Sequence, residues 1–269
     1  FGIGPFPELG VSGAAAATVT AQALVSLLFF KAVLREKVLF PHLRLWVLVP
    51  VKVWREIVRI GVPSAVQNLI YAGISMILTR LITGWGDLAV AAQRVGSQIE
   101  SVSWMVGDGF SAAVNAFLGQ NYGAKRYDRV RRGYFCAIAM TAAWGLCTTF
   151  LLIGMARPLF SIFLHEEKVM AIGVNYLRIV GLSQMFMMVE QTSIGAFSGL
   201  GRTLYPSIVS VTFTSARIPV AVLLSSVMGL SGIWWALSIS SMVKGCILFV
   251  SFVVFLYVFL ERKKDEETV

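Results

Sequence analysis

LSGIWWALSISSMVKGCILFVSFVVFLYVFL, residues Leu230–Leu260, is an apolar run with a single charged side chain, Lys244. An apolar helix needs roughly 20 residues to cross a bilayer, and this run exceeds that length. The composition of the whole chain agrees, because 57% of its 269 residues are hydrophobic and 14% are charged. Soluble domains carry about a quarter charged residues. A soluble core of this length cannot bury so much apolar surface, and the sequence therefore predicts a polytopic membrane protein.

Six more apolar segments of comparable length precede this run. Glycine, a common turn residue, marks three of the connections, at Gly84–Asp87, Gly199–Arg202 and Gly229. We expect each segment to be a helix that crosses the membrane. The predicted spans are Leu9–Val33, Ser64–Thr83, Leu88–Leu118, Gly133–Met155, Val169–Leu200, Leu204–Met228 and Leu230–Leu260. The expected fold class is therefore all-α, a polytopic membrane helix bundle with seven transmembrane helices.

A long connection, Leu34–Pro63, separates the first two spans. Its part from 51 to 60, VKVWREIVRI, has apolar residues on one helical face and charged residues largely on the other. This pattern indicates an amphipathic helix that lies in the membrane interface. Gly61 and Pro63 are expected to end that helix, because proline lacks an N–H donor and suits the first turn of the next one.

The basic residues are divided unequally between the two sides of the predicted bundle. If every span crosses, sixteen of the 23 Lys and Arg residues fall on one side and two on the other. The positive-inside rule assigns the basic side, and with it the C-terminus, to the cytoplasm. Loops that face anionic lipid headgroups then explain the net charge of +9 without a nucleic-acid partner. We expect a multi-pass protein of the bacterial inner or plasma membrane.

Two segments of the chain share the pattern G-[VL]-S-G-x-x-x-A, at Gly10–Ala17 and Gly229–Ala236. Both begin a span that runs from outside to inside, and they lie six spans apart. Parallel repeats of this kind are typical of transporters, whose substrate path lies between the two halves. We therefore expect the chain to hold the last helix of one copy and the whole of the next, with about five further spans encoded upstream.

Ionisable side chains within the spans are the candidate functional residues, because a charge in a bilayer is costly unless it is paired or faces water. Glu190 lies in a Met-rich apolar segment, and Glu100 belongs to a polar stripe along its helix. Either acid could load and release a proton, as an antiporter requires. A static structural role is the alternative for both, and for Glu190 the expected charge partner is Arg217 or Lys244.

Further polar and adaptable side chains in the spans are expected to line a substrate cavity. A polar stripe in a span must face the bundle interior, and methionine suits a tolerant binding surface. The cavity candidates are Gln67, Asn68, Tyr71, Gln98, Met187 and Gln191. The sequence shows no phosphate-loop pattern, no metal-ligand spacing and no Ser/His/Asp set. We therefore expect no enzyme and no cofactor, and we expect the energy to come from an H⁺ or Na⁺ gradient.

Five short motifs, in this order along the chain, are similar to those of one transporter family. They are RIGVPS at 59–64, AAQRVGSQIE at 91–100, GQNYGAK at 119–125, GAFSGLGRT at 195–203 and ARIP at 216–219. The chain resembles the C-terminal half of multidrug and toxin extrusion (MATE) transporters over essentially its whole length. The resemblance implies a fragment of a two-lobe transporter with six helices in each lobe, arranged as an inverted V.

The resemblance also divides the chain into three parts. Residues 1–33 would be the last helix of the N-lobe, residues 34–63 a cytoplasmic linker with the interfacial helix, and residues 64–269 the six-helix C-lobe with a short cytoplasmic tail. The implied partners are the lipid bilayer, the missing N-lobe of the same protein and small amphipathic substrates, often cationic.

The implied function is secondary antiport that exports xenobiotics or metabolites in exchange for H⁺ or Na⁺. The position of Glu190 resembles that of an acid on the same helix in many members. Some members also carry a carboxylate early in the second span, whereas this sequence has none near Tyr71. The alternatives are a flippase for lipid-linked oligosaccharides, a polysaccharide exporter of related fold, and an inactive membrane fragment.

Overall fold

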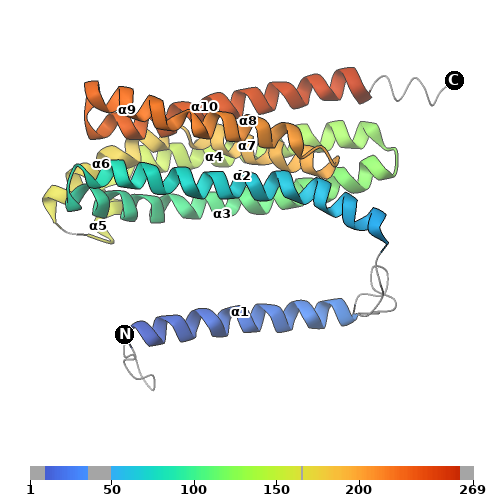
Figure 1. Cartoon of the computed structure of the whole chain (residues 1–269), viewed down its shortest axis with the longest axis horizontal. Helices are drawn as coiled ribbons and strands as arrows, with labels where there is room; N and C mark the ends of the chain where they lie inside the picture. The colour runs from blue at the N-terminus through green and yellow to red at the C-terminus, as the bar shows by residue number, and fades with distance from the viewer. Residues whose placement is uncertain (1–9, 36–49, 165, 261–269) are drawn as a thin grey trace. The chain divides into compact units, whose positions relative to one another are not determined.

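The computed structural model describes residues 10–35, 50–164 and 166–260, and these residues are helical apart from short connections (Figure 1). The helices are α1 Gly10–Arg35, α2 Val51–Thr83, α3 Asp87–Gly123, α4 Tyr127–Gly154, α5 Ala156–Ser161, α6 Glu167–Gly181, α7 Gln184–Gly199, α8 Leu204–Ser215, α9 Arg217–Met228, α10 Leu230–Phe255 and the π-helical turn η1 Leu256–Leu260. The all-α prediction is confirmed, and each of the seven predicted spans is a helix or a pair of consecutive helices. Gly86, Gly201 and Gly229 stand at three connections with φ of 96°, 70° and 64°, a conformation that favours glycine.

Several of the described helices, alone or together with the next helix, can cross a membrane by their length and composition. Five described segments pass on their own, and α6 with α7 would form a sixth span that is bent by 50° at its break. The 37-residue α3 is also long enough, but polar side chains interrupt its apolar sequence. The interrupted helix is the one that carries the predicted polar stripe around Glu100.

The chain forms two compact units, residues 1–53 and 54–269. In the first unit the structure describes α1, an apolar helix whose described side chains are nearly all exposed. Residues 36–49 of the predicted linker and residues 261–269 of the predicted tail lie outside the described residues.

The expected break between the interfacial helix and the second span is wrong. α2 is continuous from Val51 to Thr83, with Pro63 inside it, and Figure 1 shows its ribbon continuing through a bend. Proline removes one hydrogen bond from a helix and bends it, but the turns on either side can still form. The neighbouring Ile60 carbonyl also accepts a hydrogen bond from the Thr203 hydroxyl at 3.0 Å, which ties this part of α2 to the turn before α8.

α7 is the central helix of the second unit and packs against α3, α4 and α10. Small residues let these backbones approach closely, as is usual between membrane helices. A Cβ atom added to Gly195 of α7 would collide with the Ser111 carbonyl of α3. One added to Gly245 of α10 would collide with the Phe186 carbonyl of α7. These contacts set the register in which the polar side chains of α3, α7 and α10 face one another.

α2 packs against the other helices of the second unit through an apolar contact on one side. Its buried residues Ile74, Leu78 and Ile82 belong to one cluster with Ala221 of α9 and Ile233 of α10. The apolar contact therefore lies in the C-terminal half of α2, and the polar stripe from Gln67 to Ser75 begins before it.

The span formed by α8 and α9 is interrupted at Ala216. Pro219 has no N–H to donate to the carbonyl of Ser215, one turn earlier, so the hydrogen-bond ladder is broken at this point. Arg217 is the first residue of α9, so its long side chain extends from the point where α8 and α9 are interrupted.

Candidate functional site

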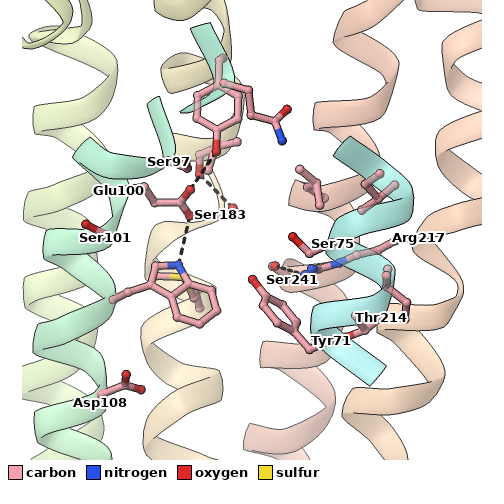
Figure 2. Close-up of a pocket in the computed structure, with 18 of the residues that line it drawn as sticks. Tyr71, Ser75, Ser97, Glu100, Ser101, Asp108, Ser183, Thr214, Arg217 and Ser241 are labelled. Carbon is pink, nitrogen blue, oxygen red and sulfur yellow. Dashed lines mark hydrogen bonds between the residues drawn. The ribbon is translucent and has the colours of Figure 1, made fainter. Parts of the chain in front are cut away.

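Two cavities that contain charged side chains lie next to each other in the second unit, between α2 and the helices that surround α7. The Glu100 cavity has a volume of about 410 Å³ and draws its lining from α2, α3 and α6 to α10 (Figure 2). The Glu190 cavity has a volume of about 350 Å³ and is lined by α2, α3, α7, α8 and α10. The residues that line both are Tyr71, Trp104, Asp108 and Thr214. The rings of Tyr71 and Trp104 pack against each other with their centroids 5.9 Å apart. This aromatic pair therefore forms part of the wall that the two cavities share.

Glu100 accepts hydrogen bonds from three helices. Trp104 Nε1 of its own helix and Gln184 Nε2 of α7 donate to Oε1 at 3.3 and 3.0 Å. The hydroxyl of Tyr176 on α6 donates to Oε2 at 3.1 Å. Both carboxyl oxygens of Glu100 are therefore satisfied by uncharged donors.

Arg217 stands on the wall of the same cavity opposite Glu100 (Figure 2). The residue is 7% exposed. Its Nε donates to Ser240 Oγ and its Nη2 donates to Ser241 Oγ at 2.9 Å, both on α10. The cavity therefore has an acid on one wall and a base on the other, each bonded to uncharged partners.

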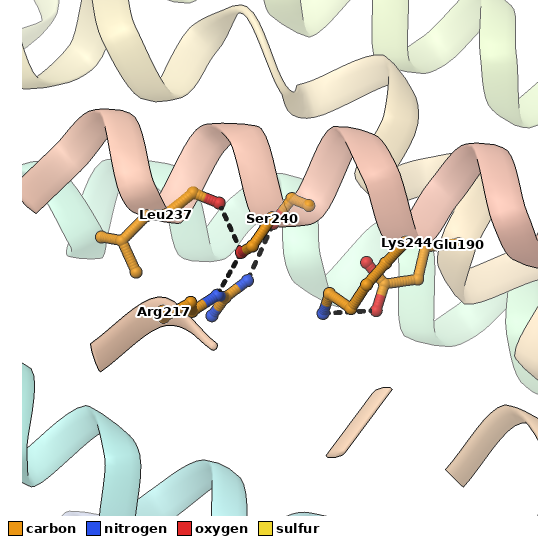
Figure 3. Close-up of polar contacts among 6 residues, drawn as sticks. Glu190, Arg217, Leu237, Ser240 and Lys244 are labelled. Atoms are coloured by element: carbon orange, nitrogen blue, oxygen red, sulfur yellow. Dashed lines mark hydrogen bonds and ion pairs between the residues drawn. The ribbon is translucent and has the colours of Figure 1, made fainter. Parts of the chain in front are cut away.

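Glu190 of α7 and Lys244 of α10 form a buried ion pair on the wall of the Glu190 cavity (Figure 3). Lys244 Nζ lies 2.7 Å from Glu190 Oε1, and both side chains are less than a tenth exposed. The close contact of Gly245 with Phe186, one turn before Glu190, brings the two groups together. The sequence left two bases, Lys244 and Arg217, as possible partners of Glu190. In the structure Lys244 pairs with Glu190, and Arg217 bonds to serine hydroxyls.

The structure brings most of the predicted cavity residues to these two sites. Gln67, Asn68 and Gln191 line the Glu190 cavity, Met187 lines the Glu100 cavity, and Tyr71 lines both. Gln98 is an exposed residue of α3 that lines neither cavity.

Sequence reasoning missed the residues that hold the charged groups in place. Tyr176 and Gln184 were not singled out, although a glutamine at the start of a Met-rich apolar segment is a signal that could have been used. Ser240 and Ser241, which bond to Arg217, were not singled out either. Within the part of the chain that the structure describes, no group of three or more His, Cys, Asp or Glu side chains could hold a metal ion.

Comparisons with known proteins agree with this architecture. Residues 63–223 match the family model MatE. A probable multidrug resistance protein NorM of Thermotoga maritima is 31% identical over 248 residues, which cover 87% of this chain and 51% of that protein. An FAD transporter of Shewanella oneidensis is 25% identical and is covered to 54% by the match, which includes 91% of this chain.

A solved structure of a multidrug resistance MATE family transporter, in an outward-facing conformation, has the same fold. The TM-score is 0.83 at 19% identity, and the match covers 94% of this chain and 58% of that one. The chain spans about half the length of the curated relatives that it matches. Both the family model and the Thermotoga maritima relative show that this chain belongs to the MatE family of transporters.

Proposed function

We propose that the chain is part of a secondary antiporter that exports xenobiotics or metabolites in exchange for H⁺ or Na⁺. In this proposal α1 is the last helix of the N-lobe, residues 64–269 are the C-lobe, and the remaining helices of the N-lobe complete the substrate path. The basic connections and the C-terminus face the cytoplasm. Support comes from the family, and from relatives named as a multidrug resistance protein and an FAD transporter.

The observation that carries the proposal is the buried pair of Glu190 and Lys244 on a cavity wall. Lys244 is a tethered cation, and a proton or Na⁺ that reaches Glu190 competes with it for the carboxylate. Once Glu190 is neutralised, Lys244 keeps a buried charge without its counterion, which is strongly unfavourable. The pair therefore favours one packing of α7 against α10, and cation binding favours another.

Coupling requires the cation and the substrate to bind two conformations with different affinities. The spans that line the cavities contain places where such a change can occur. α6 and α7 meet at a 50° bend, and α8 and α9 meet at the break beside Arg217. Binding of a proton or Na⁺ to Glu190 would thus change the shape of the cavities, because the helices that line them already contain a bend or a break where they can move.

The test uses the full-length protein in proteoliposomes, with ethidium as a fluorescent cation and an imposed H⁺ or Na⁺ gradient. We expect Glu190→Gln to reduce gradient-driven transport about tenfold or more, within the range of known coupling energies. Glu100→Gln is measured in parallel, because its carboxylate is the second coupling candidate.

Glu167→Gln is the matched control. Glu167 pairs with Arg157 at 3.1 Å, but both side chains are more than two thirds exposed, so transport should not change. Unaltered gradient dependence in Glu190→Gln would remove Glu190 from the coupling mechanism. If neither gradient drives ethidium movement by the unmodified protein, we would abandon antiport for this dye class.

A further inference from the structure

A small cavity lies on the side of α6 that faces away from the Glu100 cavity. This α6 cavity has a volume of about 250 Å³ and is lined by Arg157, Glu167, Met170, Ala171, Val174 and Arg178. Val174 and Arg178 are each two residues from Tyr176, whose hydroxyl donates to Glu100. Residues two apart in an α-helix point about 200° away from each other. The α6 cavity is therefore separate from the two cavities around α7.

The α6 cavity is built where α4 leads through α5 into α6, and Figure 1 shows α5 at one end of the second unit. The basic turn between α3 and α4 lies at the other end of α4. Arg178 is about three turns, roughly 16 Å, beyond the first residue of α6. Its backbone therefore belongs to the membrane-spanning part of the helix. A long side chain at this place extends back along the helix toward its N-terminus and the membrane surface.

The charges that line the α6 cavity do not balance. Arg157 and Glu167 form an ion pair at 3.1 Å. Among the described residues no ion pair includes Arg178, which is exposed. Two guanidinium groups thus stand beside one carboxylate, and the cavity keeps one excess positive charge. An exposed arginine within a span is costly unless it reaches an anion or the membrane surface.

Apolar side chains form the rest of the α6 cavity and its surroundings. Half of its lining residues are Met, Ala or Val of α6. Leu182, one turn beyond Arg178, is 40% exposed, and Ile162, in the connection before α6, is 71% exposed. A cation beside exposed apolar surface suits a phosphate group that carries hydrocarbon chains. The volume lies below the usual range for a whole small-molecule ligand, which fits a lipid headgroup.

We propose that the α6 cavity binds the phosphate group of an anionic phospholipid, and that Arg178 is its main ligand. A guanidinium group donates two parallel N–H bonds to phosphate oxygens. Arg157 lines the same cavity, so its charge disfavours the ammonium group of a zwitterionic lipid and favours a headgroup without one. The site lies outside the proposed substrate path, and lipid binding there does not depend on antiport.

The experiment maps where lipids contact the full-length protein. The protein is reconstituted in phosphatidylcholine vesicles that contain a small share of phosphatidylglycerol with a diazirine group close to its headgroup. After illumination, mass spectrometry of peptides identifies the labelled segments. We expect this probe to label α5 and α6 more strongly than a phosphatidylcholine probe with the same diazirine. Arg178→Gln should reduce the labelling by phosphatidylglycerol about fivefold, the usual effect of one arginine at a membrane surface.

Two further variants separate a defined site from a general effect of charge. Ala171→Trp fills the α6 cavity without changing its charge, and it should reduce the labelling by a similar factor. Arg94→Gln is the matched control, because Arg94 is an exposed residue of α3 that does not line this cavity. It should change the labelling of α6 less than about twofold. The basic turn between α3 and α4 is the internal reference, since its labelling should be the same in every variant.

Three outcomes would overturn the proposal. One is undiminished labelling of α6 in a correctly folded Arg178→Gln protein or, if that variant does not fold, in Ala171→Trp. Another is equal labelling of α6 by the two probes in the unmodified protein, which would show that the site does not select an anionic headgroup. The third is loss of the labelling when inorganic phosphate is added in excess, which would assign the site to free phosphate instead of a lipid.

Discussion

The carboxylate of Glu190 and the ammonium group of Lys244 stabilise each other because both are removed from solvent. Taking two charges out of water costs several kcal/mol each, and their attraction offsets this cost while both are present. The sequence identified both residues, because a charge in an apolar span is conspicuous. It could not choose between Lys244 and Arg217, because that choice depends on which face of α10 meets α7.

A double-mutant cycle on this pair tests the residue-scale argument. Glu190→Gln and Lys244→Gln should each destabilise the full-length protein by about 3 kcal/mol or more, since each leaves one buried charge unpaired. The double variant should recover most of that loss. Thermal unfolding in detergent measures all four proteins. Strictly additive losses would contradict the pairing, and the exposed pair of Arg157 and Glu167 should show a coupling below about 1 kcal/mol.

At the scale of helices, close backbone contact around α7 holds the site together. Glycines at these contacts replace side chains that would force the helices apart. The sequence could not show which glycines lie at helix contacts, because glycine is common throughout the apolar segments. The element boundaries were largely predictable from apolar length and glycine-containing turns. The exceptions are α2, where Pro63 was expected to end a helix that continues, and two predicted spans that the structure divides into two helices each, α6 with α7 and α8 with α9.

Gly145 of α4 offers a test of this close packing. An added Cβ would lie 2.6 Å from the backbone Cα of Met185 on α7, which cannot rotate away. Gly145→Ala should therefore destabilise the protein by about 1–3 kcal/mol, the usual cost of overpacking. Gly73→Ala on α2 is the control, because nothing lies within 4 Å of its added Cβ. A lower melting temperature for Gly73→Ala than for Gly145→Ala would refute this packing argument.

At the scale of the whole molecule, the described acids and bases of the cavities face inward while apolar side chains cover the outside. Figure 2 shows the polar groups directed toward a shared space. Large apolar residues such as Phe150 on α4 are 72% exposed on the outer surface. This distribution is inverted relative to a soluble protein, as lipid requires.

Cysteine labelling tests whether the Glu100 cavity contains water. Cys136, Cys147 and Cys246 are exposed and are first replaced by alanine. In the full-length protein in liposomes, Ser75→Cys in the Glu100 cavity should then react with a hydrophilic maleimide, and Phe150→Cys should not, because lipid covers it. The reverse pattern would show that the bundle is turned inside out relative to the membrane.

The sequence by itself determined the class of protein, the helical segments and a minority of the side chains that line the cavities, among them Glu100, Glu190, Arg217 and Lys244. It could do so because water, lipid and helix geometry act on local composition and spacing, which are visible along the chain. Only the tertiary structure decided that Glu190 pairs with Lys244, that Tyr176 and Gln184 hold Glu100, and that Arg217 bonds to Ser240 and Ser241. Each of these depends on contacts between helices far apart in the chain, and those contacts are set by the packing of glycine and apolar surfaces.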